Sequence, residues 1–209
     1  ASCIRPKHVD DDTDSEEIEV SVGEFDLVKI SSSLFNVSEI VLHPDWKSEG
    51  MRYDADIAVL VLEEPLEFTD LIQPACLPHD DSIAKEIYGF IVGWGKSENI
   101  KLPHENILRH ARIEAVNNTA CFLADHNLAQ VASFRTFCAG GSKKGPCTGD
   151  SGSGFFVKIN DAWTLKGITS AGPLNPLGGC DAERYTVFTD VYKFYSWIQG
   201  VIDGKTSAD

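Results

Sequence analysis

The chain has 209 residues, of which 43% are hydrophobic and 24% charged, so its composition excludes a disordered or fibrous protein. Its length allows one large domain or two small ones. Eighteen Lys and Arg against thirty-two Asp and Glu give a net charge of -14, which opposes binding to nucleic acid and to anionic lipid.

The start of the chain has neither an initiator Met nor the pattern of a secretory signal, so we expect that an upstream segment has been lost. No apolar run of roughly eighteen residues or more occurs, and no membrane span is expected. Seven acidic residues crowd between Asp10 and Glu19. We interpret this stretch, 10–19, as a solvated surface insertion rather than as a cation site or a docking strip for a basic partner.

Short β-type segments bounded by turn residues recur along the chain, as in an all-β sandwich or barrel. Ile18, Val20 and Val22 alternate with polar residues, which predicts a half-buried strand. The run 57–62 is apolar throughout, which predicts a strand buried on both faces. The predicted strands are Ile18–Val22, Val37–His43, Ile57–Leu62, Phe90–Trp94, Ala111–Val116, Phe155–Ile159, Trp163–Ser170 and Tyr185–Thr189.

Two segments have helical patterns. Apolar residues recur at helical spacing from Val191 to Ile202, behind a Thr-Asp pair suited to capping, which predicts a C-terminal helix. The segment Asn117–Leu123 predicts a shorter one. The connection Gln73–Pro78 contains two prolines and suits an extended linker, so we place a boundary there, with units 1–75 and 76–209.

Six cysteines lie at wide spacing, without the Cys-x-x-Cys pairs typical of zinc or thioredoxin-type sites. Disulfides formed in an oxidising compartment explain them better, so we expect a secreted protein with no metal and no cofactor. Glycosylation sequons at Asn36 and Asn117 are compatible with passage through the secretory pathway.

The segment 145–154 reads Gly-Pro-Cys-Thr-Gly-Asp-Ser-Gly-Ser-Gly and places Ser151 in a tight, glycine-bounded turn. Cys147 precedes the serine, and the strand-like Gly167–Ser170, then Cys180, then the C-terminal helix follow. In this order of features the chain resembles the chymotrypsin-like (S1) serine peptidases. The resemblance covers essentially the whole chain and implies two perpendicular antiparallel β-barrels, the first of them truncated, with a C-terminal helix.

A serine hydroxyl is a poor nucleophile at neutral pH, so acyl transfer needs a base, a carboxylate that orients the base, and donors for the oxyanion. The resemblance implies that Ser151 is the nucleophile and Asp56 the orienting acid, with the amides of Gly149 and Ser151 as the oxyanion hole. Asp56 heads an apolar strand, so it needs a hydrogen-bonding partner there.

The base is where the sequence departs from the family. Relatives read Ala-His-Cys at this point, whereas this chain reads Ala-Ser-Cys, so Ser2 occupies the histidine position. A hydroxyl cannot act as a general base near pH 7, and loss of one member of such a unit removes most of its rate advantage. The remaining histidines have no family role: His8, His43, His79, His104, His110 and His126. We therefore predict little or no triad-based peptidase activity.

The resemblance also identifies a substrate pocket. Its floor residue, Gly145, offers no countercharge for Lys or Arg. Ala171 replaces a tryptophan wall, and Thr186 replaces a glycine and narrows the slot, so small or medium apolar side chains are expected if any substrate is cleaved. The residues assigned to this pocket are Gly145, Thr148, Ser170, Ala171, Gly172 and Thr186.

Relatives mature by a cut that frees an apolar N-terminus, whose ammonium pairs with the acid before the nucleophile, here Asp150. The chain contains no Ile-Val-Gly-Gly segment, so the resemblance predicts no partner for the loop and a zymogen-like arrangement of Gly149–Ser151. It implies the disulfides Cys121–Cys138 and Cys147–Cys180. Cys3 and Cys76 are expected to be unpaired, with a Cys3–Cys76 bridge as the alternative.

Three functional interpretations follow. The first is a secreted homologue with an impaired active site that binds or regulates proteins in a proteolytic cascade. Its partners would be proteins and the upstream segment of the same polypeptide, without nucleic acid or membrane. The second is an active serine endopeptidase whose base comes from residues absent or misread at the start. The third is a broken remnant that does not fold alone.

Overall fold

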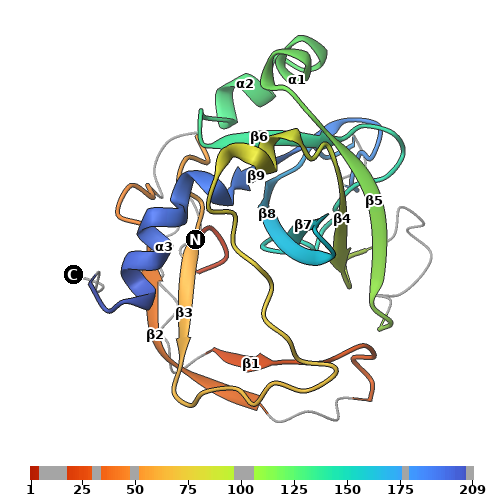
Figure 1. The fold of residues 1–209 in the computed structure, drawn as a ribbon. Helices are drawn as coiled ribbons and strands as arrows, with labels where there is room; N and C mark the ends of the chain where they lie inside the picture. Colours follow the sequence, from red (N-terminus) through yellow and green to blue (C-terminus); the bar gives the residue numbers. More distant parts are fainter. Residues whose placement is uncertain (5–17, 30–33, 48–51, 97–105, 176–178, 206–209) are drawn as a thin grey trace.

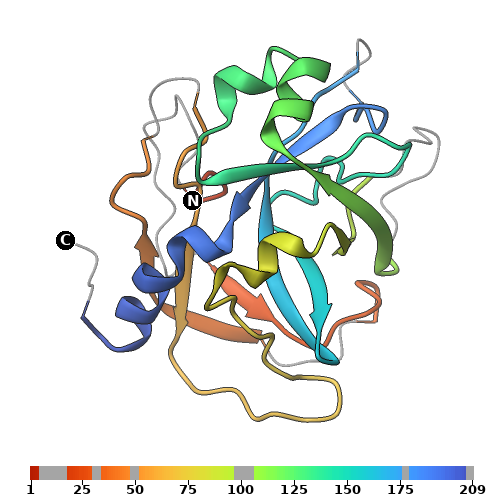
Figure 2. The same ribbon diagram turned by 45° about the horizontal axis from the view of Figure 1, so that its top comes forward.

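A computed structural model of the chain describes residues 1–4, 18–29, 34–47, 52–96, 106–175 and 179–205. Their architecture is mostly β, with a closed barrel in the C-terminal half, a separate sheet in the N-terminal half and a C-terminal helix (Figures 1 and 2). This confirms the predicted all-β class with a terminal helix. The acidic stretch 10–19 lies almost entirely outside the described residues.

Six antiparallel strands close the barrel in the order β4-β5-β6-β9-β8-β7. Aromatic side chains fill its interior: Phe155 and Phe188 are fully buried, and the ring of Phe137 stacks on Phe188 at 5.4 Å. Such packing is the main source of stability in a closed barrel, which has no free edge. The strands are β4 Tyr88–Gly93, β5 Arg109–Val116, β6 Thr136–Gly140, β7 Gly154–Ile159, β8 Ala162–Ala171 and β9 Tyr185–Asp190.

The N-terminal half contains a three-stranded antiparallel sheet of β1 Glu19–Ser21, β2 Leu34–Leu42 and β3 Ala58–Leu62, in that order. The prediction that residues 57–62 are buried on both faces is wrong for the end of the run, because Leu60 and Val61 are each 36% exposed. Successive residues of a strand point to opposite faces, so both faces of β3 are partly exposed at this point, and within the described residues β3 pairs with β2 alone.

Short helical elements connect and cover the strands. Helix α1 is capped by Asn117, whose side chain accepts a hydrogen bond from the amide of Ala120. The predicted C-terminal helix begins with a 3-10 turn and continues as α3, whereas α2 and η2 were not predicted. These elements are η2 Asp81–Lys85, α1 Asn118–Ala124, α2 Leu128–Val131, η3 Val191–Phe194 and α3 Tyr195–Ile202. In the part of the chain that the structure describes, none is long and apolar enough to cross a membrane.

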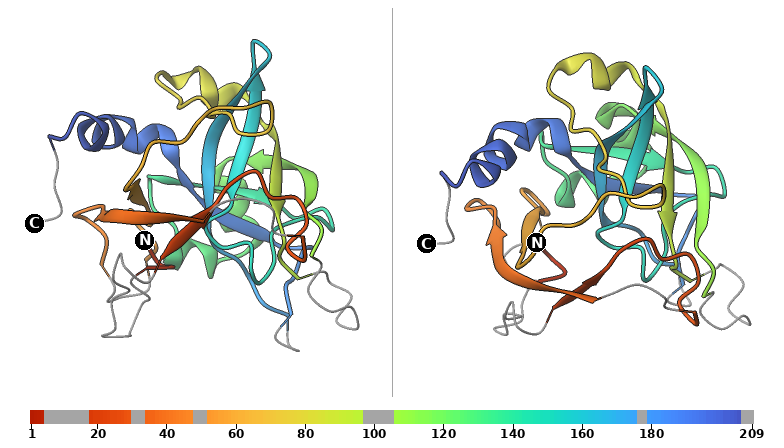
Figure 3. Two further views of the ribbon diagram at one scale, coloured as in Figure 1. Left: turned by 90° about the horizontal axis from the view of Figure 1, so that it is seen from below. Right: turned by 60° about the horizontal axis from the view of Figure 1, so that its bottom comes forward.

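The C-terminal helix joins the two halves. Figure 3 shows α3 and the three-stranded sheet on the same side of the barrel. Val191 and Phe194 form one buried cluster with Ala55 and Ile57, which flank the predicted acid. The segment 73–78 runs extended beside β8, to which Cys76 is bonded through its backbone. The boundary between 75 and 76 stays a prediction.

Candidate active site

Asp56 lies in a buried turn just before β3. Ala55 has a φ of +55° and is completely buried, and Ile57 is 3% exposed. For a residue other than glycine the left-handed region costs about 1–2 kcal/mol, so packing of the neighbouring side chains must hold this turn in place. The turn directs the Asp56 carboxylate into the space between the two halves of the chain, where it is only 3% exposed.

The Asp56 carboxylate accepts three hydrogen bonds. Oδ2 accepts from the hydroxyl of Ser2 at 2.8 Å and from that of Ser170 at 2.6 Å, and Oδ1 accepts from the backbone amide of Ser2 at 2.6 Å. The Asp56 carbonyl also accepts from the hydroxyl of Thr189 at 2.9 Å. Residues from the chain start and from β8 thus supply the polar partners that a buried carboxylate requires, and Thr189 of β9 holds the backbone of the same residue.

Ser2 therefore lies in direct contact with the acid that would orient a base. None of the described histidines makes a hydrogen bond or ion pair with Asp56 or Ser151. His43 is buried against the rings of Phe194 and Trp197, at 5.0 and 4.9 Å, and burial lowers the pKa of its imidazole. His79 pairs with Asp80, whereas His110 lies on β5 near Phe90. His8 and His104 lie outside the described residues.

Ser151 is exposed in the turn between β6 and β7, and Gly149 has a φ of +98° that favours glycine. The turn is held by the amide of Asp150, which donates to the Cys147 carbonyl at 2.8 Å, and by that of Gly152, which donates to Thr169 at 2.9 Å. Within the described structure neither the Gly149 nor the Ser151 amide donates a hydrogen bond. Amides without a partner are what an oxyanion hole requires, and the assignment of these two to such a site stays a prediction.

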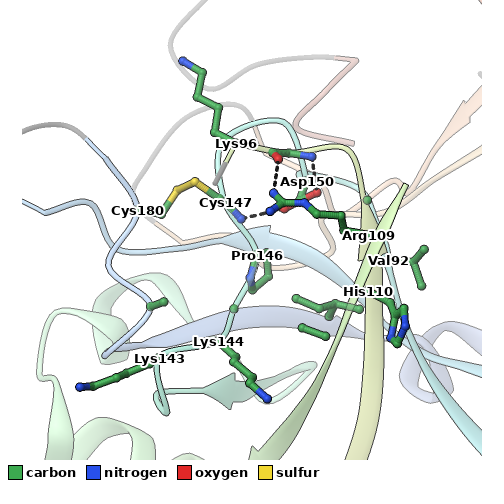
Figure 4. A pocket seen from close by; sticks show the side chains of 16 residues that line it. Val92, Lys96, Arg109, His110, Lys143, Lys144, Pro146, Cys147, Asp150 and Cys180 are labelled. Carbon is green, nitrogen blue, oxygen red and sulfur yellow. Dashed lines mark hydrogen bonds between the residues drawn. A yellow bond between two sulfur atoms is a disulfide. The ribbon is translucent and has the colours of Figure 1, made fainter. Parts of the chain in front are cut away.

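Asp150 has partners that the sequence did not predict. Its Oδ1 accepts from the Gly95 amide and its Oδ2 from the Cys147 amide, both at 2.9 Å, as the dashed lines in Figure 4 show. Asp150 thus has backbone partners within the chain, and the predicted zymogen-like arrangement of Gly149–Ser151 stays a prediction. The available signal was the Gly93-Trp94-Gly95 segment, whose glycines leave room for a side chain from elsewhere.

A cavity of about 170 Å³ opens beside Ser151. Thr186 lies between Gly145 and Gly172: a Cβ atom on either glycine would be 4.0 or 3.4 Å from its hydroxyl oxygen. Of the predicted pocket residues, Thr148, Ser170, Gly172 and Thr186 line this cavity. Gly145 and Ala171 do not, and Gly145 borders a neighbouring cavity instead.

Among the described residues no charged side chain lines the cavity beside Ser151. It therefore has no countercharge for a Lys or Arg side chain, and its lining offers apolar contacts from Pro173 and Leu174 together with hydroxyl groups.

The cysteines lie as the resemblance implies. Disulfides join Cys121 to Cys138 and Cys147 to Cys180. Cys3 and Cys76 are free and exposed, and they do not form the alternative bridge. The Cys3 sulfur lies 3.6 Å from the point where Gly152 would carry a Cβ, so the segment with Ser2 runs directly beside the nucleophile turn.

Other predicted surface sites are accessible. Asn36 and Asn117 are both exposed. The Asn36 amide nitrogen donates to Glu63, whereas Asn117 uses its oxygen to cap α1. Among the described residues no group of three or more His, Cys, Asp or Glu side chains is arranged to hold a metal ion.

Comparison with known proteins agrees with this geometry. Residues 6–198 match the family model described as Trypsin. "Serine protease gd" of Drosophila melanogaster is 32% identical over 201 residues, which cover 79% of this chain and 38% of that protein. "Ovochymase" of Halocynthia roretzi is 30% identical over 188 residues, which cover 86% of this chain and 11% of that protein. The chain thus spans well under half the length of these relatives.

Proposed function

Because the chain belongs to the trypsin family of serine proteases, we propose that it is a secreted domain of this family with an impaired catalytic site, and that it binds or regulates proteins in a proteolytic cascade. The observation that carries this proposal is the Asp56 carboxylate, which accepts hydrogen bonds from the hydroxyls of Ser2 and Ser170 and from no described histidine.

The chemistry of the hydroxyl group is the reason for the impairment. The Ser2 hydroxyl donates a hydrogen bond to Asp56 and has no basic nitrogen with which to take the proton of Ser151. In a related triad of another fold, removal of the histidine lowers kcat by roughly 10⁶-fold. Oxyanion donors alone retain roughly 10³–10⁴-fold catalysis over water, so weak residual turnover is consistent with the proposal.

The rest of the site supports a binding role. The nucleophile turn, its two unbonded amides and the cavity of about 170 Å³ are all present beside an exposed Ser151. Together they offer a partner protein one uncharged side-chain pocket and two backbone donors, features that support recognition of an extended segment without cleavage. The two disulfides and the exposed sequon residues Asn36 and Asn117 support secretion.

An active serine endopeptidase with specificity for small or apolar side chains is the second candidate. It is favoured by the presence of Ser151, Asp56 and the two oxyanion amides, which would be sufficient once a base is added. That base would have to come from a residue outside the described part of the chain. His8 and His104 are the histidines of this sequence that lie there.

Labelling by a fluorophosphonate separates these candidates. The full-length protein is compared with its Ser2→His and Ser151→Ala variants near pH 7. We expect the natural protein to label hardly faster than Ser151→Ala, and Ser2→His to label about 10³-fold faster or more. Labelling of Ser151 in the natural protein at the rate of an active serine hydrolase would refute the proposal and favour the second candidate.

A further inference from the structure

Arg109 contacts the turn that holds Asp150. It begins β5, and its Nη2 donates to the carbonyl of Gly95 at 3.0 Å. The amide of the same glycine donates to Asp150, so both polar groups of Gly95 are engaged, one by each side chain. The adjacent amide of Lys96 donates to the carbonyl of Thr148 at 2.9 Å, which pairs the turn directly with the nucleophile loop.

The fit between the turn and the loop is steric as well as polar. A Cβ atom on Gly93 or Gly95 would lie 2.0 or 2.3 Å from an oxygen of the Asp150 carboxylate, distances that real Cβ atoms essentially never show. A Cβ on Gly149 would lie 3.2 Å from the Cα of Gly95. The Asp150 carboxylate thus occupies space that only glycines leave free, and the two backbones are in close contact.

The charges around Asp150 differ from those expected at a site for an incoming ammonium. A cavity of about 280 Å³ adjoins Asp150, and among the described residues it is lined by Lys96, Arg109, Lys143 and Lys144, with Asp150 as the one acidic side chain. In Figure 4 Arg109 lies against the Asp150 loop, whereas the side chains of Lys143 and Lys144 point away from it. An ammonium that entered this cavity would meet the guanidinium of Arg109 beside its target.

We propose that Arg109 is a positioning residue that fixes the Gly93–Lys96 turn against the nucleophile loop. The arrangement of Gly149–Ser151 is then maintained by contacts within the chain and does not depend on an N-terminal ammonium freed by cleavage. This inference goes beyond the proposed function, because it concerns the conformation of the loop whether or not a base is present at position 2.

Hydrogen exchange measures this directly in the full-length protein. The reporters are the amides that join turn and loop: those of Gly95, Lys96, Cys147 and Asp150. In Arg109→Met a charge-assisted hydrogen bond is lost, and we expect their exchange to rise by about ten- to a hundredfold. Arg109→Lys, which keeps a donor and a charge, is expected to retain most of the protection.

The matched control is Arg112→Met. Arg112 lies on the same strand, is exposed, and contacts the ring of Tyr88, so its loss removes the same charge from outside the barrel. Exchange at the four reporter amides should match the natural protein in this variant. Unchanged exchange in a folded Arg109→Met protein, or an equal rise in Arg112→Met, would overturn the proposal.

A second measurement does not depend on a variant that folds. The peptide Ile-Val-Gly-Gly with a free amine is added to the natural protein, with its N-acetylated form as the control. We expect neither peptide to change the exchange of the reporter amides. Added protection by the free amine alone would show that the loop still requires an ammonium, and the proposal would be wrong. Neither result depends on catalysis, so failure here is distinct from failure of the labelling experiment.

Discussion

Replacing Ser170 by alanine removes one of the three hydrogen bonds that the Asp56 carboxylate accepts. The Ser170 hydroxyl lies 2.6 Å from Oδ2 in a site where Ser170 is 9% and Asp56 3% exposed, so water does not readily replace it. A hydrogen bond to a charged group contributes about 1.5–3 kcal/mol. Since the Ser2 hydroxyl still donates to the same oxygen, we expect a loss in the lower part of this range, about 1.5–2 kcal/mol.

In a domain of this size 1 kcal/mol lowers the melting temperature by about 2–4 °C, so Ser170→Ala should melt about 3–8 °C lower in calorimetry of the disulfide-intact protein. Ser153→Ala is the matched control, because the Ser153 hydroxyl pairs with the neutral hydroxyl of Thr169 at 3.1 Å. We expect it to cost about half as much. If Ser170→Ala were no more destabilising than Ser153→Ala, the Asp56 carboxylate would not be held as a buried, hydrogen-bonded charge, and the reasoning about the base position would fail.

Two further variants test the width of the pocket and the ion pair between Asp54 and Arg135. Thr186→Gly removes the side chain between Gly145 and Gly172. In the Ser2→His background, the ratio of kcat/KM for a Phe substrate to that for an Ala substrate should therefore rise by about tenfold. An unchanged ratio would contradict the hypothesis that Thr186 narrows the pocket. Hydrogen bonds from Arg135 hold the pKa of Asp54 below its ordinary value. Stability from this pair is therefore present above a pH of about 4 and is lost as pH falls through the lower folded-state pKa. In urea titrations the stability difference between the natural protein and Asp54→Asn should hold above about pH 5 and shrink towards about pH 2; a difference that grows on acidification would show that the pair is not the cause.

The local part of the fold could be predicted because it depends on short-range patterns. The run Phe155–Ile159 lies within β7 and Tyr185–Thr189 within β9, since alternation and turn residues fix where a strand begins and ends. The short helices α2 and η2 were missed, because segments of four or five residues carry too few positions to show a helical period. The exposure of Leu60 depends on which strands lie beside β3, which no local pattern contains.

In the candidate site, too, local motifs could be predicted from the sequence, whereas contacts between distant residues could not. The order of motifs along the chain predicts Ser151 and Asp56 as site residues, but the partners of Asp56 come from far away in sequence, such as Ser2, which lies 54 positions from it. Asp54 is likewise half-buried between Ser133 and Arg135, which lie in the other half of the chain. Pairings of this kind follow from how the two halves pack, and the sequence of either half alone does not encode them.

Asp56 with Ser2 and the nucleophile loop are held in place by different parts of the molecule. This supports the proposed binding function over a complete loss of function. Ser2 is bonded to Asp56 at the start of the chain, whereas the nucleophile loop is fixed by the Cys147–Cys180 disulfide, by the barrel strands and by Arg109 through Gly95. Ser2 shares Asp56 with the pocket residue Ser170, but it makes none of the hydrogen bonds that fix the nucleophile loop. Ser2→His should therefore raise the rate of fluorophosphonate labelling and leave hydrogen exchange of the loop amides unchanged. Arg109→Met should raise the exchange of those amides and leave the labelling rate low, because it supplies no base.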